Sequence, residues 1–161
     1  MTDTAPAYEL AYVEARRALD DQHAVVSELR GRAGVLIAAA AITTSFFGDA
    51  ALSDGRLGIA GWAAVAAFVL AAVRVVAMLW PLPGWRFAVD ARAYIGTYLE
   101  RPGAEPFELQ RIHRDLALHM ASSFARNRKH VVSLVRALRT AMLLLVLEII
   151  AWVIALITQG A

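Results

Sequence analysis

The chain contains no cysteine, which excludes disulfide bonds, cysteine-ligated zinc and cysteine nucleophiles within these 161 residues. Lysine is almost missing as well, because arginine supplies 15 of the 16 basic residues. The net charge is only +2, which argues against a strongly basic nucleic-acid-binding protein. Apolar residues are abundant instead: 59% of the chain is hydrophobic, against roughly 45–50% in soluble domains. This composition favours a membrane protein.

Three stretches of the chain are apolar enough to cross a bilayer as helices. They cover residues 33–52, 57–80 and 140–158. A helix of about 20 predominantly apolar residues spans the hydrocarbon core, and each stretch fits that length. The first two are separated by a few polar and glycine residues, so we predict a two-span hairpin over residues 33–80.

Two further regions predict helices with one apolar face. In residues 7–32, seam positions recur at spacings of three and four: Tyr8, Tyr12, Ala15, Leu19, Gln22, Val26 and Leu29. This is the heptad spacing of a helix that packs on a partner helix. Residues 85–139 form the second helical region, with a loop at 101–106 where two prolines and a glycine occur.

The last helix is expected to continue into the third span, because no proline or glycine occurs between residues 107 and 158. The predicted fold class is therefore an all-α membrane protein. It has three transmembrane helices, and the amphipathic residues 7–32 and 85–139 pack together as a cytoplasmic helical bundle.

The distribution of positive charge predicts the orientation. Fourteen of the 16 basic residues lie before the first span or between the second and third, and the short turn near residue 53 carries only Arg56. Loops rich in arginine and lysine stay in the cytoplasm. We therefore expect a multi-pass protein of the inner membrane with a cytoplasmic N-terminus and an external C-terminus. The polar residues 1–6 are followed by no apolar core, so we expect no cleaved signal peptide.

Two charged residues lie within the predicted spans. Arg74 is six residues from Trp80 and Glu148 is eight residues from Thr140, which places them about 9 Å and about 12 Å deep. A charge at this depth is costly, so an Arg74–Glu148 ion pair would stabilise the packed spans. Three alternatives stay open: Arg74 extends to the head groups, Glu148 is protonated, or both residues line a water-filled path.

The hydroxyl residues Thr43, Thr44 and Ser45 interrupt the first span. They either bond to their own or a neighbouring helix, or form a ring of hydroxyls at an oligomer axis. Small residues recur every four positions in the second span, as in Ala63, Ala67 and Ala71, and such faces permit close helix packing. We therefore expect a homo-oligomer in the bilayer.

No catalytic signature occurs in the chain, and its four histidines are too far apart to form a metal site, so we expect no enzyme, cofactor or metal. A basic group flanks the third span: Arg126, Arg128, Lys129, Arg136 and Arg139. We interpret these residues as contacts for anionic lipid head groups. A site for a nucleotide phosphate is the alternative.

The order of the elements also resembles a family. A charged helix leads directly into the span "LRGRAGVLIAAAAITTSFFG" (29–48), and a second helix enters the last span in "LALHMASSFARNRKHVVSLVRALRTAMLLLVLEII" (116–150). This layout is similar to that of small bacterial membrane effectors of nucleotide-signalling antiphage systems, namely the SLATT-type two-span effectors and the Pycsar membrane effectors. The resemblance implies a protein that oligomerises and damages the inner membrane when a nucleotide second messenger or a partner protein triggers it.

The sequence favours two functions over a third, a transporter subunit, because three spans leave little room for a midplane substrate site without partner chains. The first is an oligomerising effector or pore-forming protein of the kind that the resemblance implies. The second is a non-catalytic membrane scaffold that binds another protein through its cytoplasmic helices. In both cases the partners are the bilayer and other polypeptides, and we expect no nucleic acid.

Overall fold

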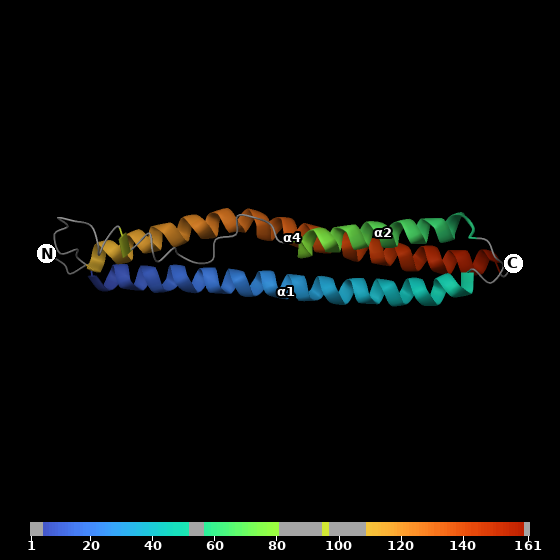
Figure 1. Cartoon of the computed structure of the whole chain (residues 1–161), viewed down its shortest axis with the longest axis horizontal. Helices are drawn as coiled ribbons and strands as arrows, with labels where there is room; N and C mark the ends of the chain where they lie inside the picture. The colour runs from blue at the N-terminus through green and yellow to red at the C-terminus, as the bar shows by residue number, and fades with distance from the viewer. Residues whose placement is uncertain (1–4, 52–56, 81–94, 97–108, 160–161) are drawn as a thin grey trace. The chain divides into compact units, whose positions relative to one another are not determined.

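The computed structural model describes residues 5–51, 57–80, 95–96 and 109–159, and this part of the chain holds three long α-helices (Figure 1). Helix α1 covers Ala5–Ala51, helix α2 covers Ile59–Leu79 and helix α4 covers Leu109–Gln159. Each helix is long and apolar enough to cross a membrane. The prediction of an all-α chain with three candidate spans is thus confirmed, and by helix length and hydropathy the protein is a multi-pass membrane protein.

Two of these helices are longer than a single span requires. Helix α4 is unbroken over 51 residues, which confirms that the helix before the third span continues into it. Helix α1 is unbroken over 47 residues and joins the predicted amphipathic helix to the first span. Helix α2 ends where Trp80 donates its backbone N–H to the carbonyl of Val76 at 2.9 Å, directly before Pro81.

Several predictions fall on residues that the structure does not describe. The turn at 52–56 and the loop at 101–106 lie outside the described residues. The same holds for the helix expected in residues 85–100, apart from Ile95 and Gly96.

The chain divides into two compact units, which we describe separately. The amphipathic unit consists of Met1–Val26 and Leu82–Val131, and the span unit consists of Ser27–Pro81 and Val132–Ala161. Helices α1 and α4 contribute residues to both units, whereas α2 belongs to the span unit alone.

In the amphipathic unit, α1 and α4 pack along the seam that the sequence predicts. The ring of Tyr12 stacks on His113 with 5.4 Å between ring centroids, and Gln22 Nε2 donates to the carbonyl of Phe124 at 3.4 Å. The partners are 101 and 102 positions apart, so the two helices run parallel. The seam residues Leu19, Val26 and Met120 are buried, as are three polar residues: Gln22, Ser123 and Asn127.

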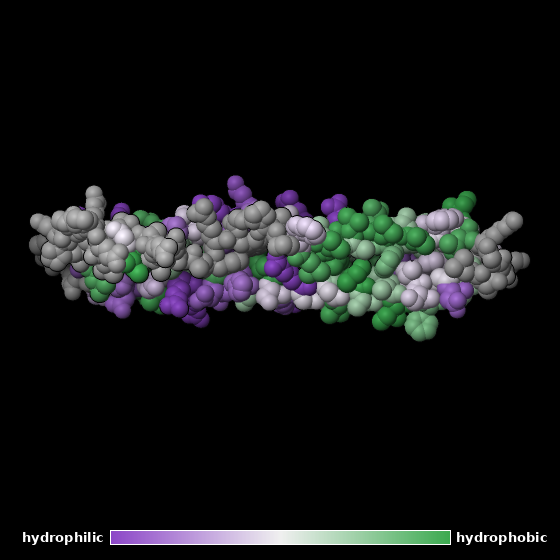
Figure 2. Space-filling view, viewed as in Figure 1, coloured by the Kyte–Doolittle hydropathy of each residue, from purple (hydrophilic) through white to green (hydrophobic). Residues whose placement is uncertain are grey.

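In the span unit, α1 and α4 run parallel and α2 runs in the opposite direction (Figure 1). The core is built around the large ring of Trp152 and three fully buried alanines, namely Ala51, Ala64 and Ala155. These small residues come from all three helices, and they let the backbones approach closely around the ring. Large apolar side chains such as Val69, Leu143 and Ile157 point outward instead. In Figure 2 apolar side chains cover the face around α2, as expected for a surface that contacts lipid.

Candidate functional site

The span unit buries one carboxyl group in the middle of an apolar helix. Glu148 lies on α4 and is 0% exposed. The buried positions of α4 in this unit include Ala141, Glu148, Trp152 and Ala155, so they are separated by seven, four and three residues. Glu148 therefore occupies a seam position that an apolar residue would normally fill. Helical periodicity directs its side chain inward, against α1.

Helix α1 supplies a partner for this carboxyl group. The hydroxyl of Thr44 donates to Glu148 Oε1 at 2.5 Å. The second oxygen, Oε2, is buried and has no hydrogen-bond partner, and the same is true of Nε1 of Trp152, one turn further along α4. Glu148, Thr44 and Trp152 thus form a polar site that satisfies one carboxyl oxygen and leaves one acceptor and one donor unpaired.

Arg74 does not share this site. Its side chain is exposed on α2, and in the described part of the chain no ion pair joins it to Glu148. The structure thus places Thr44, rather than Arg74, at the carboxyl group, and extension of Arg74 to the head groups stays a prediction.

The three neighbouring hydroxyl residues of α1 have different surroundings, because successive helix residues are rotated by about 100°. Thr44 faces α4, whereas the hydroxyl of Thr43 donates to the carbonyl of Ala39 in its own helix at 3.0 Å. Ser45 is exposed, and it lines a surface hollow of about 410 Å³ together with Phe46 and Asp49. Thr43 thus bonds to its own helix and Thr44 to a neighbouring helix, and a ring of hydroxyls at an oligomer axis stays a prediction.

The five basic residues that flank the third span are all exposed. Arg126, Arg128 and Lys129 belong to the amphipathic unit, and Arg136 and Arg139 belong to the span unit. Arg126 Nη2 donates to Ser122 Oγ at 3.4 Å, one turn earlier on the same helix. These side chains are thus available to anionic head groups, and their role stays a prediction. Among the described residues, no group of three or more histidine or acidic side chains could hold a metal ion.

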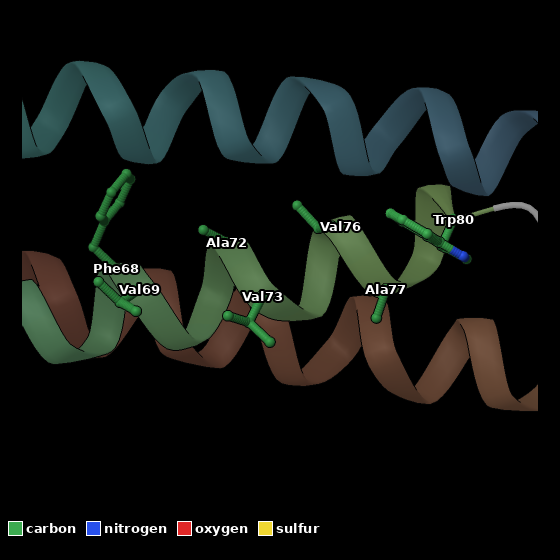
Figure 3. A pocket seen from close by; sticks show the side chains of 7 residues that line it. All are labelled: Phe68, Val69, Ala72, Val73, Val76, Ala77 and Trp80. Atoms are coloured by element: carbon green, nitrogen blue, oxygen red, sulfur yellow. The ribbon is translucent and has the colours of Figure 1, made fainter.

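An apolar groove of about 430 Å³ lies on helix α2 (Figure 3). It is lined by Phe68, Val69, Ala72, Val73, Val76, Ala77 and Trp80. Six of these described residues come from α2 and the seventh, Trp80, caps its C-terminal end, and their lining surface is almost entirely apolar. Its surface can therefore contact lipid acyl chains, and its lining residues include no side chain of the kind that catalyses a reaction or binds a metal.

Comparison with protein-family models, with curated proteins and with solved structures finds no match for this chain.

Removing the hydroxyl of Thr44 tests whether the polar site holds the span unit together. We expect Thr44→Val to lower the free energy of unfolding by about 1–2 kcal/mol, because the buried carboxyl group loses its one donor while the side-chain volume is kept. Thermal unfolding in detergent micelles measures the change. Thr43→Val is the matched control, since its hydroxyl bonds within its own helix, and it should cost less than about 0.5 kcal/mol. Equal losses in the two variants would contradict a structural role for the bond.

Proposed function

We propose that this chain is an inner-membrane protein that self-associates in the bilayer and perturbs it on a cytoplasmic signal, as an oligomerising effector or pore-forming protein. One observation supports this most directly: Ser45 and Asp49 are exposed and lie one turn apart on α1, within the predicted span of residues 33–52. Polar side chains that face lipid are unfavourable, and they are normally covered by another helix or by water. A second copy of the chain would provide that cover.

The arrangement of the helices supports assembly of several copies. Three helices pack directly on one another around Trp152, and Glu148 is closed inside that packing. In the described part of the span unit, the helices of one chain therefore shield Glu148 from water. If copies associate through the exposed face of α1, Ser45 and Asp49 would line the shared axis.

The signal would be received by the amphipathic unit. The positive-inside pattern predicts that this unit is cytoplasmic, and a nucleotide second messenger or a partner protein could reach it there. The resemblance in layout to the membrane effectors of nucleotide-signalling antiphage systems points in the same direction. The exposed Arg126, Arg128 and Lys129 are the residues that we would test first for contact with a phosphate or an anionic lipid.

Cysteine crosslinking tests the self-association independently of any trigger, because the chain has no cysteine of its own. We expect Ser45→Cys to give disulfide-linked dimers in oxidised membranes. Val153→Cys, which is exposed on α4, is the matched control and should not crosslink. Crosslinking at neither position, or equally at both, would count against an axis formed by α1.

Expression in a bacterial host tests the effect on the membrane. Induction should depolarise the cells and stop growth, and the double variant Ser45→Leu, Asp49→Leu should lose this effect at an equal amount of protein in the membrane. Ile42→Leu, an apolar change on an exposed position of the same helix, should keep it. A double variant as toxic as the unmodified protein would exclude this face as the functional one.

A scaffold function is the second candidate, and the surface of the amphipathic unit favours it. Leu10, Val13 and Leu118 are 62%, 49% and 55% exposed there. Exposed apolar residues of this size are typical of surfaces that bind another protein. The scaffold would be favoured over the effector by two results together. Expression would be harmless to the cells, and a partner protein that co-purifies in stoichiometric amounts would dissociate in Leu10→Glu or Leu118→Glu.

A further inference from the structure

We propose that Glu148 is a proton-binding site of the span unit, in which the carboxyl group keeps its proton while α1 and α4 are packed together. The proposal depends on the surroundings of one residue in one chain. It therefore does not rest on the self-association or the membrane damage proposed above.

Burial without a counter-charge is the first reason. Glu148 is 0% exposed, one oxygen accepts a bond from Thr44 and the other has no partner. An isolated ionised carboxylate is far more costly to bury than a neutral polar group, and such groups usually neutralise instead. A proton removes the charge without any need for a cationic side chain.

The charged groups of the packed helices offer no such cation. On α2 the charged residue is Arg74, which is exposed and forms no ion pair with Glu148. On α1 the nearest is Asp49, which is acidic and exposed, five residues beyond Thr44. The remaining charged residues among those described in this unit lie more than two turns away along their helices: Glu28, Arg30, Arg32, Arg136 and Arg139.

The same site also has a means of releasing the proton. Trp152 Nε1 is a buried donor without a partner, one turn from Glu148 on the same face of α4. An ionised carboxylate accepts several hydrogen bonds, whereas the neutral carboxyl group has less acceptor capacity. When the proton leaves, Thr44 and Trp152 can both donate to the carboxylate. These two hydrogen bonds would stabilise the ionised form of Glu148 while the proton is exchanged.

A hydrophobic carbodiimide tests the proposal, because it enters the apolar part of the bilayer and reacts with protonated carboxyl groups. The carboxyl proton moves to a carbodiimide nitrogen, the carboxyl oxygen adds to the central carbon, and the adduct rearranges to a stable acylurea. We expect one adduct per chain in liposomes at neutral pH, mapped to Glu148 by peptide mass spectrometry. The adduct should be absent from Glu148→Gln and should decrease as the pH is raised.

Other variants separate the possible outcomes. Thr44→Val, which leaves the carboxyl group buried, should still be labelled. Failure to label Glu148 at any pH, while the detergent-unfolded chain is labelled, would overturn the proposal. Protection by sodium or potassium ions at constant pH would also overturn it, because the ligand would then be a metal cation. The double variant Ser45→Leu, Asp49→Leu should be labelled as the unmodified protein is, so failure of the proposed function would not affect this result.

Discussion

Replacing Trp152 by alanine should lower the free energy of unfolding by about 3 kcal/mol, the largest loss that we expect from a single truncation in this chain. Trp152 is 1% exposed and packs against Ala51, Ala64 and Ala155. Its ring also lies against Gly48, whose Cβ, if it had one, would be 3.6 Å from the ring. The alanines and the glycine cannot move into the space left by the indole. Larger side chains at the edge of this core, such as Phe47 and Leu156, can fill it only in part, so a cavity would remain.

The size of this effect depends on packing rather than on exclusion from water. Within lipid, helices are held together by van der Waals contacts and hydrogen bonds, because the acyl chains are as apolar as the side chains. The estimate is therefore at the lower end of the range for tryptophan in soluble cores, about 3–5 kcal/mol. Thermal unfolding in detergent micelles would measure it.

Two controls separate packing from other roles of the ring. Trp152→Phe keeps most of the aromatic volume and removes the unpaired Nε1 donor, so it should cost much less than the alanine variant. Trp62→Ala removes the same number of atoms from a side chain that is 63% exposed, and it should change the stability by less than about 1 kcal/mol. If Trp62→Ala and Trp152→Ala were equally damaging, the core assigned to the span unit would be wrong.

The three candidate spans and the continuity of α4 could be predicted because both follow from composition. Apolar runs of sufficient length and a long segment without proline or glycine are visible in the sequence alone. The burial of Gln22 could also be predicted, since it falls on the three-and-four spacing that begins at Tyr8. In each case the prediction uses a sequence pattern that lies within one helix and needs no information about a second helix.

The partner of Glu148 was harder to predict, because the depth of a residue along a span does not tell in which direction its side chain points around the helix axis. Arg74 and Glu148 have similar depths in the sequence, yet one is exposed and the other is buried. Extending the seam of α1 would not have found Thr44 either. The alternating spacing of four and three that begins at Tyr8 passes through Ala33 and Ala40 and next reaches Thr43 rather than Thr44.

Enlarging Ala64 should have the second large effect. Ala64 is 0% exposed in the core that joins α2 to the other two helices. We expect Ala64→Leu to lower the free energy of unfolding by about 3 kcal/mol, because the added atoms must displace the Trp152 ring or separate the helix backbones. Thermal unfolding in detergent would measure this loss. Since α2 belongs to the span unit alone, whereas α1 and α4 also pack in the amphipathic unit, we expect the packing of α2 to weaken before either long helix unfolds.

The neighbouring residues supply a graded control for this prediction. Ala63 is exposed, so Ala63→Leu places the same side chain toward lipid and should change the stability by less than about 0.5 kcal/mol. Ala71 and Ala67 are 2% and 9% exposed on the buried face of α2, so their leucine variants should follow Ala64→Leu in that order. Equal losses at all four positions would mean that leucine destabilises α2 itself. A loss that decreases with exposure would show that the small residues of α2 are required because the three helices pack through them.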